Sequence, residues 1–191
     1  MFSRCNSSPN SNLDARVQSR KITAYMYSVD IAAARAVTLT ASGYAGQRMA
    51  VAVSKLGNGP LYVFMPIVVF IYLGHKAPAV IITSTISALM LHLVYPMLKR
   101  YVARPRPFEA DQSITSLLDV RDKYSFPSGH TMTAAASVVP IICADWKFFP
   151  IGAGIILTMS WARMATGHHY LSDVLAGIAL GGFVGFLCAH I

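Results

Sequence analysis

The segment 77–98 constrains the fold most, because it is long, apolar and free of charged side chains. About 20 apolar residues in a helix are enough to cross the hydrocarbon core of a bilayer. The other apolar runs are shorter, and each needs polar residues at one end to complete a span: 61–73, 129–144, 148–162 and 174–191. We therefore expect an all-α, multi-pass membrane helical bundle of about five to six spans.

The composition also favours a membrane protein. Hydrophobic residues make up 54% of the chain, charged residues only 13%, and the mean hydropathy is +0.50, whereas soluble domains carry about 25% charged residues. The formal net charge is +8, but the basic residues are scattered between apolar runs. We therefore expect contacts with the lipid bilayer and with an anionic substrate, and no nucleic-acid partner.

The N-terminal part of the chain differs from the rest. Residues 1–24 are polar and rich in Ser and Asn, which predicts a flexible polar arm, and residues 25–191 then form a single membrane-embedded domain. Between residues 24 and 55, Asp30 and Arg35 interrupt the apolar positions. This pattern favours one or two amphipathic helices in the membrane interface, and a first spanning helix is the alternative.

The last apolar run carries Gly177, Gly181 and Gly185 at intervals of four residues. On a helix this spacing places all three on one face, where a neighbouring helix can approach closely. Packing inside the bundle is the favoured interpretation and dimerisation is the alternative, so the sequence leaves the oligomeric state open.

Three polar clusters stand at the ends of apolar runs. They are Lys99 with Arg106 and Pro107, then Pro127 to His130, and then Arg163 with His169 and Asp173. If 77–98 crosses from side one to side two, the alternation of the following helices brings all three clusters to side two. The sequence therefore predicts one shared site at one face of the membrane.

Five residues of these clusters suit the binding of a phosphate group. Lys99, Arg106 and Arg163 can neutralise its charge, and the two guanidinium groups can bind its oxygens bidentately. The backbone amides around Ser128 and Gly129, at the start of a helix, add further donors.

Three more residues suit the transfer of a phosphoryl group to an imidazole. His169 and Asp173 are four residues apart, so on a helix they lie on one face, whereas His168 is rotated from Asp173 by about 140°. An imidazole held by the carboxylate through one nitrogen keeps the other nitrogen free to attack phosphorus. His130 is the expected general acid, which later acts as the base that activates water.

We expect no metal ion and no other cofactor. Phosphatases that use two metal ions bind them with several carboxylates, and Asp173 is the one carboxylate within the three clusters. The acidic residues of the intervening loop are too irregularly spaced to propose as ligands: Glu109, Asp111, Asp119 and Asp122. Arg100 and Arg104 are interpreted as charges that flank a membrane helix.

Together the clusters resemble the signature of the type 2 phosphatidic acid phosphatase superfamily, which contains lipid phosphatases and haloperoxidases. The matching residues are Lys99, Arg106 and Pro107 for the first motif, Pro127, Ser128, Gly129 and His130 for the second, and Arg163, His169 and Asp173 for the third. The resemblance covers about residues 55–190. Ala162 stands where the family usually has Ser, which affects only a secondary hydrogen bond.

The resemblance implies a phosphohistidine mechanism, with His169 as nucleophile, Asp173 as its orienting partner and His130 as general acid. It also implies that the substrate is a membrane lipid phosphate, such as undecaprenyl diphosphate, phosphatidylglycerophosphate, phosphatidic acid or lipid A. The alternatives are a lipid phosphotransferase that uses the same site and a non-enzymatic anion-binding membrane protein.

The resemblance further implies a bacterial inner (plasma) membrane protein whose site faces the extracytoplasmic side, where bacterial relatives mostly work. An interfacial segment 24–55 gives the opposite indication. It would place the basic N-terminal arm on the same face as the site, and the positive-inside rule assigns such a face to the cytoplasm.

Overall fold

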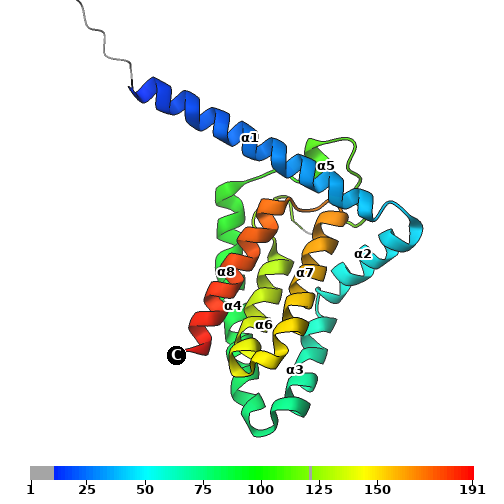
Figure 1. Ribbon diagram of the computed structural model, residues 1–191, viewed down its shortest axis with the longest axis vertical. Helices are drawn as coiled ribbons and strands as arrows, with labels where there is room; N and C mark the ends of the chain where they lie inside the picture. Colours follow the sequence, from blue (N-terminus) through cyan, green and yellow to red (C-terminus); the bar gives the residue numbers. More distant parts are fainter. Residues whose placement is uncertain (1–10, 121) are drawn as a thin grey trace, which may run out of the picture.

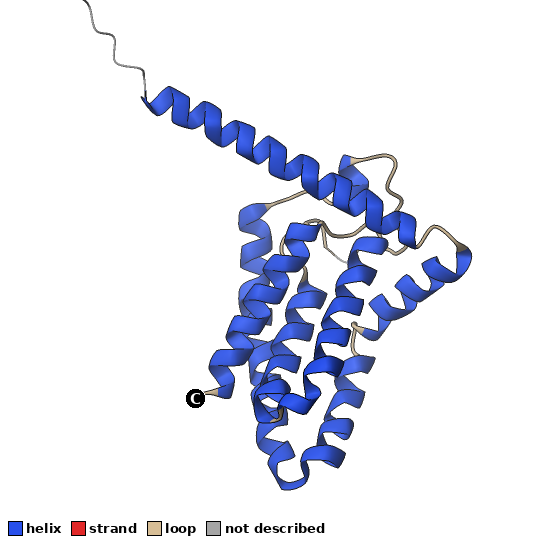
Figure 2. Ribbon diagram, in the orientation of Figure 1, coloured by secondary structure: helices blue, strands red, loops and turns tan. Residues whose placement is uncertain are grey.

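The computed structural model describes residues 11–120 and 122–191, and within these ranges every regular element is a helix (Figures 1 and 2). The elements are α1 (Ser11–Thr40), α2 (Tyr44–Leu56), α3 (Pro60–Leu73), the short η1 (Gly74–Lys76), α4 (Ala77–Val102), α5 (Pro107–Ala110), α6 (Gly129–Ala144), the short η2 (Trp146–Phe148), α7 (Phe149–Ala165) and α8 (Leu171–Ala189). The prediction of an all-α fold is confirmed.

Helices α3, α4, α6, α7 and α8 form a bundle (Figure 1). Helix α6 is its central element, because it packs against α8, α4 and α7. Its buried residues include Ala134, Ala135 and Ala136. These small side chains let the surrounding helices approach the α6 backbone closely, as in other membrane bundles.

In the described part of the chain, three segments are long and apolar enough to cross a membrane: Pro60–Ala110, Trp146–Ala165 and Leu171–Ala189. The first of them contains both α3 and α4, and the shorter apolar helix α6 lies among them. Large apolar side chains such as Ile71 and Leu93 point outward from the bundle, where lipid would cover them. The fold is therefore a multi-pass membrane helical bundle, as expected.

The glycine face of α8 packs against α6. A Cβ atom at Gly177 would lie 2.7 Å from the carbonyl oxygen of Ser128, and one at Gly181 would lie 2.2 Å from the carbonyl oxygen of Met132. Gly185 faces the same helix. The expected packing of this face inside the bundle is confirmed.

Helix α1 crosses one end of the bundle obliquely and extends beyond it (Figure 1). It contacts α7 and α8 and is not among the candidate spans found in the described part of the chain, in agreement with an interfacial helix. It begins at Ser11, within the segment 1–24 that we expected to be a flexible arm. Neither Gly nor Pro occurs between residues 11 and 40 to interrupt the helix. Residues 1–10 of the expected arm lie outside the described residues.

Candidate active site

The three polar clusters meet at the end of the bundle that α1 crosses. Lys99 lies in the last turn of α4, Ser128 immediately precedes α6, and Arg163 lies near the end of α7. His169 is in the loop before α8, and Asp173 is in the first turn of that helix. The prediction that helix alternation brings the clusters to one face is confirmed.

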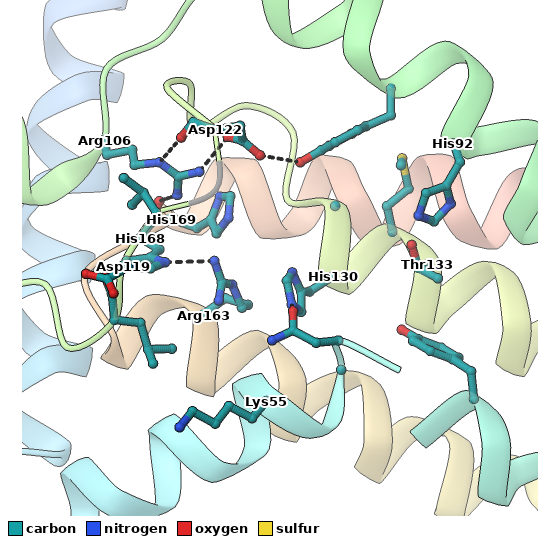
Figure 3. A pocket seen from close by; sticks show the side chains of 18 residues that line it. Lys55, His92, Arg106, Asp119, Asp122, His130, Thr133, Arg163, His168 and His169 are labelled. Atoms are coloured by element: carbon teal, nitrogen blue, oxygen red, sulfur yellow. Dashed lines mark hydrogen bonds and ion pairs between the residues drawn. The ribbon is translucent and has the colours of Figure 1, made fainter. Parts of the chain in front are cut away.

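A cavity of about 640 Å³ lies between these helix ends (Figure 3). The predicted site residues that line it are Arg106, Gly129, His130, Arg163 and His169. The other predicted residues, Lys99, Ser128 and Asp173, are buried and do not line it. Lys55, at the end of α2, lines the opposite side of the cavity from Arg106 (Figure 3).

Asp122, from the loop between α5 and α6, binds two of the predicted phosphate-binding cations. Its Oδ1 atom lies 2.5 Å from Lys99 Nζ and 2.7 Å from Arg106 Nη2. Burial raises the pKa of Asp122, but the ammonium and guanidinium groups beside it lower that pKa more strongly, and the net shift is downward. Asp122 is therefore ionised at neutral pH and acts as an anion within the cationic part of the site. No motif in the sequence marked it for this role.

His168 connects the two arginines of the site. Arg163 Nη2 lies 2.8 Å from His168 Nδ1, and Arg106 Nη1 donates to the His168 carbonyl oxygen over 2.9 Å. Because Nε2 lies 3.0 Å from the Leu118 carbonyl, which only accepts, Nε2 carries the proton and Nδ1 accepts from Arg163. Burial, followed by the charges of Arg163 and Arg106, lowers the pKa of His168 to about 4. His168 is thus a neutral acceptor that holds a cation.

His169 faces the cavity beside its predicted orienting carboxylate. The Nδ1 atom of His169 lies 3.6 Å from Asp173 Oδ2, which is longer than a hydrogen bond. The same carboxylate accepts from the Tyr170 backbone N–H over 2.9 Å and from Arg104 Nη1 over 2.8 Å. Catalytic contacts are often long in unliganded enzymes and shorten with substrate. The pair lies close together, but the expectation that both residues stand on one helix is wrong, because α8 begins at Leu171 and His169 lies in the loop before it.

The surroundings of His169 keep its imidazole neutral. Only 2% of the residue is exposed. Burial is the largest cause that holds the pKa of His169 well below 6.5, and the positive charges of Arg163, Arg106 and Lys99 act in the same direction. A neutral imidazole has a free lone pair, so the site favours the nucleophilic form of this residue.

His130, the predicted general acid, faces the same cavity as His169 and Arg163 (Figure 3). Its Nε2 atom lies 2.8 Å from Oδ1 of Asn58, which belongs to the linker between α2 and α3. No signal in the sequence marked Asn58, because the linker carries none of the three motifs. Ser128, two residues before His130 in the sequence, is buried and does not line the cavity. Its hydroxyl lies 2.9 Å from that of Thr131.

The interpretation of Arg104 as a simple flanking charge is wrong. Its guanidinium group contacts Asp173 and also Asp30 of α1. The reason lies in the residue that follows α4, because Ala103 has a left-handed backbone with φ of 48°. This conformation turns the chain away from the helix axis, so Arg104 points toward the start of α8 and not toward lipid headgroups.

Within residues 11–120 and 122–191, no group of three or more His, Cys, Asp and Glu side chains is arranged to hold a metal ion. Turnover without a metal or other cofactor remains a prediction that a chelator can test.

The chain is similar to several known proteins. A family model described as the PAP2 superfamily matches residues 77–191. An undecaprenyl-diphosphatase of Sulfolobus acidocaldarius is 29% identical over 140 residues, which cover 72% of this chain and 66% of that protein. A decaprenylphosphoryl-5-phosphoribose phosphatase of Mycobacterium tuberculosis is 32% identical over 99 residues, or 52% of this chain and 54% of that protein. The matches thus span about half to two thirds of the relatives' own lengths.

A solved structure has the same fold. It is a transmembrane PAP2-type phosphatidylglycerolphosphate phosphatase from Bacillus subtilis, which superposes with a TM-score of 0.66 at 24% identity and covers 87% of this chain and 85% of that one. The family match extends over more than half of the present chain and includes all three polar clusters. The chain therefore belongs to the PAP2 superfamily.

Proposed function

We propose that this protein is a membrane lipid phosphatase that works through a phosphohistidine intermediate without a metal ion. One observation carries the proposal: a buried, neutral imidazole, that of His169, faces a cavity lined by Arg106, Arg163 and His130. A nucleophile, two cations and a second histidine are the groups that such a reaction needs around one phosphate.

The cationic part of the site would bind the phosphate. A phosphate monoester carries a charge of about −1.5 to −2 at neutral pH, so it competes well with the single charge of Asp122 for Lys99 and Arg106. Arg163, near the end of α7, lines the same cavity and would also contact the phosphate. The backbone amide of Gly129, which lines the cavity at the start of α6, would add a donor. The Ser128 amide, which we expected to do the same, donates to the Asp173 carbonyl oxygen over 3.0 Å.

In the first chemical step, the lone pair on Nε2 of His169 attacks phosphorus. A P–N bond forms while the P–O bond to the lipid breaks, and His130 gives its proton to the departing oxygen. The products are the lipid, which leaves as an alcohol or, from a diphosphate, as a monophosphate, and a phosphorylated His169 whose imidazole is cationic. Asp173, beside Nδ1, stabilises that positive charge.

In the second step, water replaces the imidazole. His130, now neutral, takes a proton from water as its oxygen attacks phosphorus. The P–N bond breaks, its electron pair returns to Nε2, and inorganic phosphate leaves. Both histidines are then in their starting protonation states, so the cycle needs no further reactant.

The substrate would be a lipid that extends from the site into the bundle. A second cavity of about 320 Å³ lies between α3, α4 and α6, and Tyr62, His92 and Thr133 line both cavities. This continuity, together with lipid-phosphate relatives, supports undecaprenyl diphosphate, phosphatidylglycerophosphate, phosphatidic acid or lipid A as substrates. A panel of these lipids, assayed in detergent for released phosphate, would identify the preferred one.

The decisive comparison uses two variants of the full chain. His169→Ala should abolish phosphate release from every lipid while the melting temperature stays near that of the wild type. Arg100→Gln, which changes an exposed cation next to Lys99, should keep wild-type activity. Full activity of the His169 variant would end the proposal.

Transfer to a second lipid shares the covalent intermediate, and product analysis separates it from hydrolysis. With a lipid diphosphate labelled at its terminal phosphate, hydrolysis places the label in inorganic phosphate, whereas a phosphotransferase places it on another lipid.

We also propose placement in the bacterial inner membrane with an extracytoplasmic site. Helix α1 lies across the end of the bundle that carries the site. The positive-inside rule would assign this face, with the basic N-terminal helix, to the cytoplasm, whereas bacterial relatives mostly work on the extracytoplasmic side. A cysteine placed at the exposed Asp119, in a chain without its native cysteines, would decide the side. Labelling by an impermeant maleimide in intact cells supports the extracytoplasmic side, and labelling only after lysis contradicts it.

A further inference from the structure

Asp30 of α1 is a buried carboxylate at the start of α8. The residue is 6% exposed, and its Oδ1 accepts from the backbone N–H of Ser172 over 3.0 Å. The hydroxyl of Ser172 also donates to Asp30, and Arg104 Nη2 lies 2.7 Å from Asp30 Oδ2. An acidic side chain of α1 thus accepts from an otherwise unsatisfied N–H in the first turn of α8.

Arg104 bridges Asp30 to the predicted partner of the nucleophile. Its Nη1 atom lies 2.8 Å from Asp173 Oδ1 and 2.7 Å from Ser172 Oγ. The guanidinium carbon lies 3.8 Å from the centre of the Tyr170 ring. Hydrogen bonds at its edge and the Tyr170 ring at its face therefore fix the guanidinium group in one orientation.

The charges of this bridge matter for the reaction. One guanidinium between two carboxylates leaves a net negative charge next to His169. Without Asp30, Arg104 and Asp173 would form a neutral pair, and Asp173 would stabilise a cationic imidazole less. The His169 imidazole becomes cationic when Nε2 is phosphorylated, so the second carboxylate favours the step that forms the intermediate.

We propose that Asp30 and Arg104 are positioning residues for His169, which act on it by fixing the orientation and charge of Asp173. The inference rests on the proposed function. Asp30 lies outside residues 77–191, which the family model matches, so helix α1 supplies a contribution to the site that the three motifs do not contain.

The test is steady-state kinetics on the full chain in detergent, with Asp30→Asn and Arg104→Lys. A lysine keeps the charge of Arg104 but lacks the planar fork of donors that holds the two carboxylates in one orientation. We expect kcat to fall by about tenfold or more, the loss seen when groups that orient a metal-binding histidine are replaced. KM should stay within about twofold, because the phosphate contacts are unchanged. The rate at which phosphohistidine forms in a single turnover should fall with kcat.

A matched control separates positioning from the docking of α1. Arg35, also on α1, forms an ion pair with Asp111 away from the catalytic groups. Arg35→Gln should leave kcat at the wild-type value. An equal loss of kcat in Arg35→Gln and Asp30→Asn would show that α1 acts only by stabilising the bundle.

The double variant supplies the second criterion. If Asp30 acts through Arg104, Asp30→Asn combined with Arg104→Lys is no slower than Arg104→Lys alone. Multiplied losses would overturn the proposal. An inactive His169→Ala protein together with a fully active Asp30→Asn protein would refute this inference alone, whereas activity in His169→Ala would refute the proposed function itself.

Discussion

Substitution of Gly181 by Ala tests the packing on which the site depends. The added Cβ would lie 2.2 Å from the carbonyl oxygen of Met132 and 2.9 Å from the Cβ of Ala135. Neither atom can rotate away, because one belongs to the backbone and the other is a Cβ. Carbon–oxygen contacts between helices are normally about 3.3–3.6 Å, so α8 has to move away from α6 by about 1 Å.

The expected cost follows from this overlap. Overpacking in a core costs about 1–3 kcal/mol. Gly182 provides the matched control, because a Cβ there would meet only Val139 Cγ2, at 3.9 Å. Ala at position 182 gains about 0.8–1 kcal/mol of helix propensity without a clash. Gly181→Ala has the same gain in helix propensity, so the two variants should differ in free energy of unfolding by the overpacking cost alone, about 1–3 kcal/mol.

Thermal unfolding of the two variants in the same detergent measures this difference. For a chain of this length each kcal/mol shifts the melting temperature by about 2–4 °C, so Gly181→Ala should melt roughly 2–12 °C below Gly182→Ala. Because α6 carries Gly129 and His130 at its start, phosphate release by Gly181→Ala should fall as well. Equal melting temperatures would contradict a tight contact between α6 and α8.

Three further predictions concern the site. The pKa values of His168 and His169 lie below 6.5 in the folded protein, so below pH 6.5 the unfolded chain binds more protons than the folded one. The free energy of unfolding should therefore fall toward about pH 4, with a slope of at most about 1.4 kcal/mol per pH unit for each histidine. A melting temperature that stays constant from pH 7 to 5 would contradict this. Asp122→Asn removes the anion that Lys99 and Arg106 hold, so inorganic phosphate should inhibit the enzyme about tenfold more strongly. The measurement is a titration of phosphate release from lipid. Unchanged inhibition would mean that phosphate does not bind to Lys99 and Arg106. Activity should persist in excess chelator, and loss that a divalent ion restores would reject the metal-independent mechanism.

The sequence predicted the parts of this protein that depend on periodicity and spacing. Apolar run lengths gave the helical bundle, and helix alternation placed Lys99, Ser128 and His169 at one end. The spacing of the glycines gave the packing face of α8. Each of these features is local, so a few neighbouring residues are enough to define it.

The parts that were missed depend on contacts between distant segments. Arg100 and Arg104 both follow Lys99 and look alike in the sequence, but the left-handed turn at Ala103 directs only Arg104 into the protein. Asp30 binds it from a segment whose mixed composition favoured an interfacial helix and carried no sign of a contact with the site. Asp122 reaches Lys99 and Arg106 through an irregular loop, in which spacing carries no information about direction.

The exposure of their carboxylate partners divides the cations Lys99, Arg104 and Arg106 into two kinds. The side chain of Asp122, which holds Lys99 and Arg106, is 39% exposed, so it can move into water when a phosphate takes its place. The partners of Arg104 are Asp30 and Asp173, whose side chains are 9% and 0% exposed. Moving either would leave a buried charge without a partner, which costs about 3–5 kcal/mol. Phosphate therefore competes for Lys99 and Arg106 but not for Arg104, although Arg104 and Arg106 are separated by a single proline.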